Sequence, residues 1–158
     1  MLLVDAVEGV RSQTFNIIKQ LFSLKLDVVL CINKVDRLFD ELSMEPFDIF
    51  IKLLQLIADV NQTVETVSNQ HDYFLLSKNV FVSSGYQGWG FSVSGLIEQL
   101  MASVPQLASA DKEQFKEQLS QNDFVLTEQG VKKCSTQKPL IVQLVLEPIQ
   151  RVYQMTKS

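Results

Sequence analysis

Apolar and polar residues follow one another in blocks that predict strands and helices in turn. The apolar run at 2–4 ends in Asp5 and predicts the end of a buried strand. A helix is predicted at 13–24, because its apolar residues recur on one face: Phe15, Ile18, Leu21 and Phe22. The mostly apolar run at 27–32 does not alternate, which predicts a strand with helices on both faces of its sheet. Strand, helix and strand within about 30 residues form a βαβ unit with parallel strands.

The following segments continue this alternation of helices and strands. The pattern predicts a helix at 46–61, a polar helix end and loop at 62–72, a short strand at 80–82, a turn-rich stretch at 83–90 and a helix at 93–103. The predicted fold is therefore α/β, with a doubly wound, mostly parallel sheet.

The character of the sequence changes after this helix. Residues 105–138 are polar, and we expect a small insertion with a short helix and a hairpin formed by 124–126 and 131–133. The segment at 140–153 again has apolar residues at helical spacing. Pro148 lies inside it and predicts either a kink or a strand that gives way to a helix.

Composition, net charge and cysteine count exclude several classes of protein. The 158 residues are 46% hydrophobic, which fits one compact domain, and 14 Lys and Arg against 18 Asp and Glu give a net charge of −4. Direct binding to DNA through charge is therefore not expected. Cys31 and Cys134 are too few for a disulfide framework and predict reduced thiols. No apolar run approaches the roughly 18 residues of a membrane span, and the N-terminal residues do not form a signal peptide, so we expect a cytoplasmic protein without membrane contact.

The glycines are unevenly distributed. Four of the six lie between Gly85 and Gly95, and only Gly9 precedes them. The chain therefore has no place for a glycine-rich phosphate-binding loop.

The sequence Asn33-Lys34-Val35-Asp36 directly follows the run at 27–32, at the end of a parallel strand where doubly wound sheets bind ligands. Asn-Lys-x-Asp is the guanine-recognition element of GTP-binding proteins. Guanine presents two adjacent donors, N1–H and the exocyclic amine, and the Asp36 carboxylate can accept both. Adenine lacks that amine and presents an acceptor at the ring position, so such a site discriminates by roughly 10⁴ or more. Lys34 can lay its alkyl stem over the base, with its ammonium in water, and Asn33 can tie neighbouring loops together.

A second element, Ser84-Gly85-Tyr86, follows the strand at 80–82. GTP-binding folds place such a loop after the next strand, and there the Gly85 N–H is expected to point at guanine O6. Ser84 would bond back toward Asp36, and Tyr86 would cover the base. Each motif alone has an ordinary alternative, a solvated strand-end turn, and it is their pairing that favours guanine recognition.

Four further residues are interpreted one by one. Trp89 could cover a base or face a ribosome, but packing under its loop is favoured. His71 predicts a surface loop rather than a metal site, because no cysteine cluster lies nearby. Asp5 lies near the phosphate end of an intact fold or merely caps its loop. Cys31 is expected to be an inert, buried thiol.

Several segments together carry a family resemblance. They are 4–10 with Gln13-Thr14, 32–38, 41–46 leading on to 60–61, 88–91 after Ser84-Gly85-Tyr86, and 139–149. The sequence resembles the translational GTPases of the elongation factor two type over most of its length, and the resemblance weakens at 62–78 and 104–137. Within that family it is similar to the elongation-factor-like GTPases of ribosome biogenesis, then to elongation factor two itself, then to the spliceosomal paralogue.

The resemblance implies a partial G domain of the P-loop GTPase type that lacks its first strands. It divides the chain into a guanine-recognition part at 1–104, a small α+β insertion at 105–138 and a return helix at 139–158. It also implies that GTP or GDP binds through Asn33, Lys34, Asp36, Ser84, Gly85 and Tyr86. The intact protein would carry Mg²⁺ and act on the ribosome, in the release of the anti-association factor from cytoplasmic large subunits or in translocation.

The departures from the family pattern matter equally. The chain contains no Gly-x-x-x-x-Gly-Lys-Ser/Thr loop, no threonine-bearing switch and no Asp-x-Pro-Gly-His motif. We therefore expect no catalytic residue and no magnesium ligand, and we expect no GTP hydrolysis by this chain alone. The alternative is a truncated, non-catalytic remnant that serves as a binding module.

Overall fold

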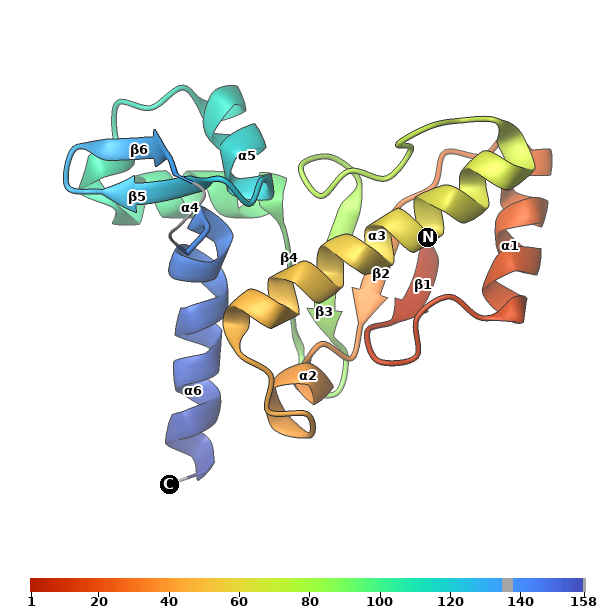
Figure 1. The fold of residues 1–158 in the computed structure, drawn as a ribbon, viewed down its shortest axis with the longest axis horizontal. Coiled ribbons are helices and arrows are strands. Elements are labelled where there is room, and N and C mark those ends of the chain that lie inside the picture. Colours follow the sequence, from red (N-terminus) through yellow and green to blue (C-terminus); the bar gives the residue numbers. More distant parts are fainter. Residues whose placement is uncertain (135–137, 158) are drawn as a thin grey trace.

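The computed structural model describes residues 1–134 and 138–157 (Figure 1). Its main sheet has the order β1-β2-β3-β4, with β1 to β3 parallel and β4 antiparallel to β3. The four strands are β1 (Leu2–Asp5), β2 (Leu30–Asn33), β3 (Val80–Ser84) and β4 (Trp89–Ser92). The mixed α/β fold with a parallel-containing sheet confirms the predicted class, and it is consistent with part of a P-loop GTPase domain.

One face of this sheet forms the core. Helix α3 (Pro46–Ser68) lies across that face, and α1 (Ser12–Ser23) packs against α3 on the β1 side (Figure 1). The strand residues that point to this face are all buried: Leu2, Val4, Leu30, Ile32, Val80, Val82 and Phe91. Apolar residues at helical spacing on α3 cover them, among them Phe50, Leu53 and Ile57.

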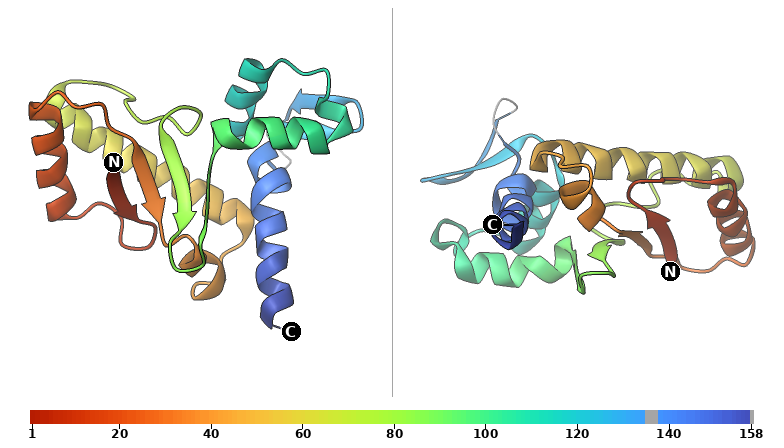
Figure 2. Two further views of the ribbon diagram at one scale, coloured as in Figure 1. Left: turned by 180° about the vertical axis from the view of Figure 1, so that it is seen from behind. Right: turned by 90° about the horizontal axis from the view of Figure 1, so that it is seen from below.

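The opposite face of the sheet has no helix over it in the described part of the chain (Figure 2). Leu3 and Phe81 point to this side and are 56% and 37% exposed. The apolar run at 27–32 predicted helices on both faces, and this expectation is wrong for the described residues. Cys31, between Leu3 and Phe81 in register, is nevertheless buried and free, as expected.

Helix α3 continues past residue 61 to Ser68, so the stretch at 62–72 is a helix end and a loop, as predicted. Val64 supplies the reason, because it is fully buried and extends the apolar stripe by one turn. The hydroxyls of Thr63, Thr66 and Ser68 bond back to carbonyls one turn earlier, so these polar residues are accommodated within the helix. The helix ends at Asn69, in the left-handed conformation typical of a helix cap.

Two elements were not predicted from the sequence. Strand β4 turns the stretch at 83–90 into a hairpin, in which Phe91 points to the core and Trp89 lies half-buried. Helix α2 (Asp36–Asp40) is a single turn directly after β2, and its end is held by an ion pair of 2.9 Å between Arg37 Nε and Glu41 Oε2.

The chain then adds a small unit beside β4. Helix α4 (Val93–Ser103), as predicted, is capped by the Ser92 hydroxyl, which accepts from Gly95 N–H. A short 3₁₀ turn, Pro105–Leu107, leads to α5 (Lys112–Ser120) and to the predicted hairpin of β5 (Phe124–Thr127) and β6 (Gly130–Lys133).

The last segment is helical throughout. A π-helical turn, Val142–Leu146, passes into α6 (Glu147–Lys157), and neither a strand nor a break is present. Proline clashes with the carbonyl four residues earlier and lacks an N–H. The wider π turn directly before Pro148 accommodates both effects. None of the helices in the described part of the chain has the length and apolar composition needed to span a membrane.

Candidate functional site

The two predicted motifs lie side by side at the carboxyl ends of β2 and β3. The Asn33 side chain joins them, because its Oδ1 accepts hydrogen bonds from the Gly85 N–H at 2.9 Å and from the Ser83 hydroxyl at 3.1 Å. A backbone bond of 3.2 Å from Val35 N–H to Ser83 O adds to this connection. The predicted role of Asn33 in tying the loops together is therefore seen directly.

Asp36 is the first residue of α2, and it is only 7% exposed. Its Oδ1 atom is buried and has no hydrogen-bond partner among the described residues. A buried carboxylate oxygen without a donor is unusual, because each unsatisfied polar atom costs stability. The arrangement leaves an acceptor available for donors that the described residues do not supply.

Lys34 adopts a left-handed backbone conformation, with φ +63°. Its Nζ atom forms an ion pair of 2.8 Å with Asp5 Oδ2, and this carboxylate raises the pKa of the lysine. The side chain is about half exposed. The ammonium was expected in water over a base, whereas in the structure it is bound to Asp5, the last residue of β1.

Asp5 is the centre of the charges at this end of the sheet. Its Oδ1 accepts from the N–H groups of Val7 at 2.8 Å and Glu8 at 3.1 Å, so it caps its loop as one of the two interpretations predicted. Burial opposes ionisation of Asp5, but the bonds from Lys34 and from the two backbone donors outweigh it and hold the carboxyl pKa below its ordinary value. A second cation, Arg37, lies 3.9 Å away.

The loop at 84–86 differs from the predicted arrangement. The Gly85 N–H is bonded to Asn33 rather than directed at a base position, and the fully buried Ser84 hydroxyl accepts from Gln87 N–H. No bond from Ser84 to Asp36 is present. Tyr86 is 91% exposed at the tip of the loop. The predicted roles of Ser84 and Gly85 therefore need correction, because both groups are used to shape the turn itself.

Sequence reasoning missed one residue that completes the network. The Ser83 hydroxyl donates to Asn33 Oδ1 and lies 3.3 Å from the Cys31 thiol. Its position as the first of two serines at the end of a predicted strand was the available signal. Trp89, in contrast, packs as expected between the hairpin and α6, and its indole donates to the Tyr153 hydroxyl at 3.0 Å.

With this geometry established, the chain can be compared with known proteins. The elongation factor Tu GTP binding domain, as a family, matches residues 1–146. This chain belongs to that family. Among translational GTPases, "Ribosome assembly protein 1" of Saccharomyces cerevisiae is 29% identical over 190 residues, covering 98% of this chain. The protein of the same name in Schizosaccharomyces pombe is 31% identical over 99% of this chain.

A shorter match links the chain to the translation factors. "Elongation factor 2" of Sulfurisphaera tokodaii is 36% identical over 98 residues, or 59% of this chain. The chain spans 17% of the length of each of the two ribosome assembly proteins and 13% of this elongation factor. These matches confirm the resemblance to translational GTPases that the motifs indicated.

Translational GTPases as a family bind guanine nucleotides, and members of the family need a metal site beside the phosphates. No group of three His, Cys, Asp or Glu side chains among residues 1–134 and 138–157 could hold a metal ion. His71 lies on the surface, as predicted, and pairs with Glu65 at 3.0 Å. The donor set for Mg²⁺ does not fit this part of the chain, and no residue is assigned to it.

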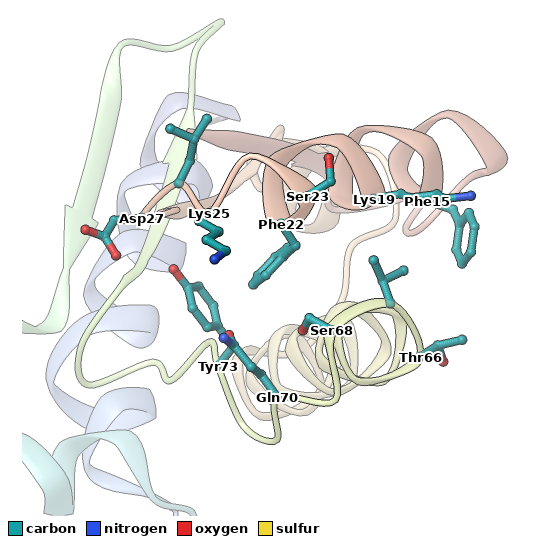
Figure 3. A pocket seen from close by; sticks show the side chains of 12 residues that line it. Phe15, Lys19, Phe22, Ser23, Lys25, Asp27, Thr66, Ser68, Gln70 and Tyr73 are labelled. Atoms are coloured by element: carbon teal, nitrogen blue, oxygen red, sulfur yellow. The ribbon is translucent and has the colours of Figure 1, made fainter.

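A cavity of about 740 Å³ lies away from the base-recognition motifs, between the ends of α1 and α3 (Figure 3). Phe22 and Tyr73 line it and meet edge to face, with ring centroids 4.9 Å apart. The cavity also includes Lys25 and Asp27, which precede β2 and therefore lie toward the amino ends of the strands. In doubly wound folds ligands bind at the carboxyl ends, so this cavity is not the expected nucleotide site.

Proposed function

We propose that this chain is the guanine-recognition part of a translational GTPase and that it binds GTP and GDP through the base. The observation that carries the proposal is the buried Asp36 carboxylate, whose Oδ1 lacks a partner at the ligand-binding edge of the sheet. Guanine N1–H and the exocyclic amine are two adjacent donors that match the two oxygens of one carboxylate. Such charge-assisted bonds are the strong ones in proteins.

The neighbouring residues have supporting roles in this proposal. Asn33 holds the two loops together, and the Lys34 stem covers one face of the base. Ser84 and Gly85 shape the second loop, and the exposed Tyr86 ring closes over the base when nucleotide is present. The division into a guanine-recognition part (1–104), a small insertion (105–138) and a return helix (139–158) belongs to the same proposal.

For the whole protein, we propose a role in the cytoplasmic maturation of the large ribosomal subunit, with release of the anti-association factor. The shared name of the two relatives that align with 98% and 99% of this chain, "Ribosome assembly protein 1", supports this role. GTP hydrolysis and Mg²⁺ binding would require groups that these 158 residues do not contain, because the phosphate-loop and switch motifs are absent from them.

The 36% identity to "Elongation factor 2" supports a second candidate, a translocation GTPase. The match covers 59% of the chain, against 98% and 99% for the ribosome assembly proteins, so we favour ribosome assembly. Both candidates share the same guanine site.

The test is a titration of the purified chain with a fluorescent GDP analogue, followed by competition with GDP, IDP and ADP. We expect Asp36→Ala to weaken GDP binding by about 10²-fold or more, because two hydrogen bonds to a charged group are lost. Hypoxanthine lacks the exocyclic amine, so GDP should compete better than IDP with the unaltered chain, and this preference should vanish in Asp36→Ala.

Asp59→Ala is the matched control, because Asp59 is an exposed carboxylate on α3. It should bind GDP as the unaltered chain does. Absence of binding at millimolar nucleotide, or equal GDP affinity in Asp36→Ala, would contradict the proposal.

A further inference from the structure

We propose that Asp5 is a positioning residue of the guanine site, which sets the position of Lys34 through their ion pair. This inference rests on the proposed function, and it adds a residue from the first strand to a site otherwise formed after the second and third. It makes the loop that follows β1 part of base recognition, although that loop contacts no base itself.

The backbone of Lys34 shows why the side chain needs an anchor. Its φ of +63° lies in the left-handed region, which few residues other than glycine adopt. Such conformations cost free energy and persist only where surrounding contacts over-determine them. The ion pair of 2.8 Å between Lys34 Nζ and Asp5 Oδ2 fixes the far end of the side chain.

Asp5 is itself well suited to serve as that anchor. Its side chain is 15% exposed, and its Oδ1 is held by the N–H groups of Val7 and Glu8. The backbone is fixed as well, because Asp5 pairs in register with Asn33 and the Ala6 N–H donates to Asn33 O at 2.8 Å. The carboxylate therefore has one orientation relative to the start of the Asn-Lys-x-Asp motif.

The consequence is preorganisation of the lysine. With Cα and Nζ both held, the four-carbon stem loses most of its rotamer freedom before a base arrives, and binding does not have to supply that ordering. Arg37 also lies near Asp5, at 3.9 Å, but its guanidinium is bonded to Glu41 at 2.9 Å. Lys34 is therefore the principal partner of Asp5.

The experiment uses Asp5→Asn, which keeps an Oδ1 acceptor for the Val7 and Glu8 N–H groups but removes the charge. We expect GDP affinity to fall about two- to fivefold, the range typical of a partly exposed ion pair. The preference for GDP over IDP should stay unchanged, because Asp36 is intact. In a Lys34→Met background, Asp5→Asn should cause no further loss, because the two residues act as one unit.

Glu8→Gln is the control, since Glu8 lies in the same loop but its side chain pairs with Arg11 at 3.8 Å. It should leave GDP affinity unchanged. Equal affinity of Asp5→Asn and the unaltered chain would overturn this inference alone, and so would an undiminished effect of Asp5→Asn in the Lys34→Met background. Absence of GDP binding by the unaltered chain would overturn the proposed function and this inference with it.

Discussion

The indole N–H of Trp89 donates a hydrogen bond of 3.0 Å to the hydroxyl of Tyr153, which connects strand β4 to helix α6. The Tyr153 ring also stacks on Phe39 of α2, with centroids 5.2 Å apart and planes within 8°. Helix α2 begins with Asp36, so α6 supports the turn that carries this buried carboxylate. Burial raises the pKa of Tyr153, and the nearby Asp36 and Asp40 carboxylates add to that shift against the opposing bond from Trp89.

We expect Tyr153→Phe to lower the free energy of unfolding by about 1 kcal/mol, because it removes the partner of the Trp89 N–H and keeps the stacked ring. Urea unfolding followed by tryptophan fluorescence measures this directly, since Trp89 is the single tryptophan. Tyr153→Leu should cost more, because the stacking on Phe39 is lost as well. Val152→Ala, at an exposed position, is the control and should change little.

Acid should remove the contribution of the Asp5 ion pair to stability. The folded-state pKa of Asp5 lies below its ordinary value of 3.8, so the stabilisation is present above that value and is lost as the pH falls through the lowered folded pKa. At pH 7 the unaltered chain should therefore resist urea better than Asp5→Asn. The difference should shrink toward zero at a pH below the lowered folded pKa of Asp5, where the carboxyl is protonated in both folded and unfolded chains. A difference that persists unchanged at this pH would show that the charge is not the source.

Asn61 on α3 fixes the segment before β3. Its Oδ1 accepts from Phe74 N–H at 2.8 Å and its Nδ2 donates to Phe74 O at 2.9 Å, while Phe74 is fully buried. Asn61→Ala should lower the free energy of unfolding by about 2–4 kcal/mol, because both backbone groups lose their partners. Asn61→Asp keeps the acceptor and should be less damaging at pH 7. Equal stability of Asn61→Ala and the unaltered chain in urea unfolding would contradict this role.

Gly90 pairs with Ser83 across the β3–β4 pair, and the Phe81 ring lies against it. A Cβ atom at residue 90 would lie 2.7 Å from Phe81 Cε1 and 3.0 Å from Ser83 Cβ, closer than van der Waals contact allows. Gly90→Ala should therefore destabilise the chain by about 1–2 kcal/mol in thermal or urea unfolding. The cost should fall when Phe81→Ala is combined with it. Gly85→Ala is the control, because its nearest neighbour would be 3.4 Å away.

Local periodicity was sufficient to predict much of the fold. Helices α1 and α4 and the hairpin of β5 and β6 lie where the spacing of apolar residues and turn residues placed them. The end of α3 was placed only within 62–72, because its exact position depends on the burial of Val64, and burial depends on distant segments. Strand β4 was missed because its four residues form a strand through pairing with β3, which a local sequence pattern does not show.

The candidate site, too, could be predicted from local sequence patterns only in part. The motif residue Asn33 was identified correctly as a neighbour of the second loop, since parallel strands bring their carboxyl ends together, whereas the expected bond between Asp36 and Ser84 is not found. The pairing of Lys34 with Asp5 was not predicted, because it depends on the left-handed turn at Lys34 and on the register of β1 with β2. The hydrogen bond of Gly85 to Asn33 likewise follows from how close the two loops approach.

The uncovered face of the main sheet has a practical consequence for anyone who works with this protein. The Leu3 and Phe81 side chains are 56% and 37% exposed on that face, and they point away from the buried core on the other side. Polar replacements at these two positions should reduce aggregation at high protein concentration while leaving the fold intact. Engineering for solubility can therefore begin on this surface.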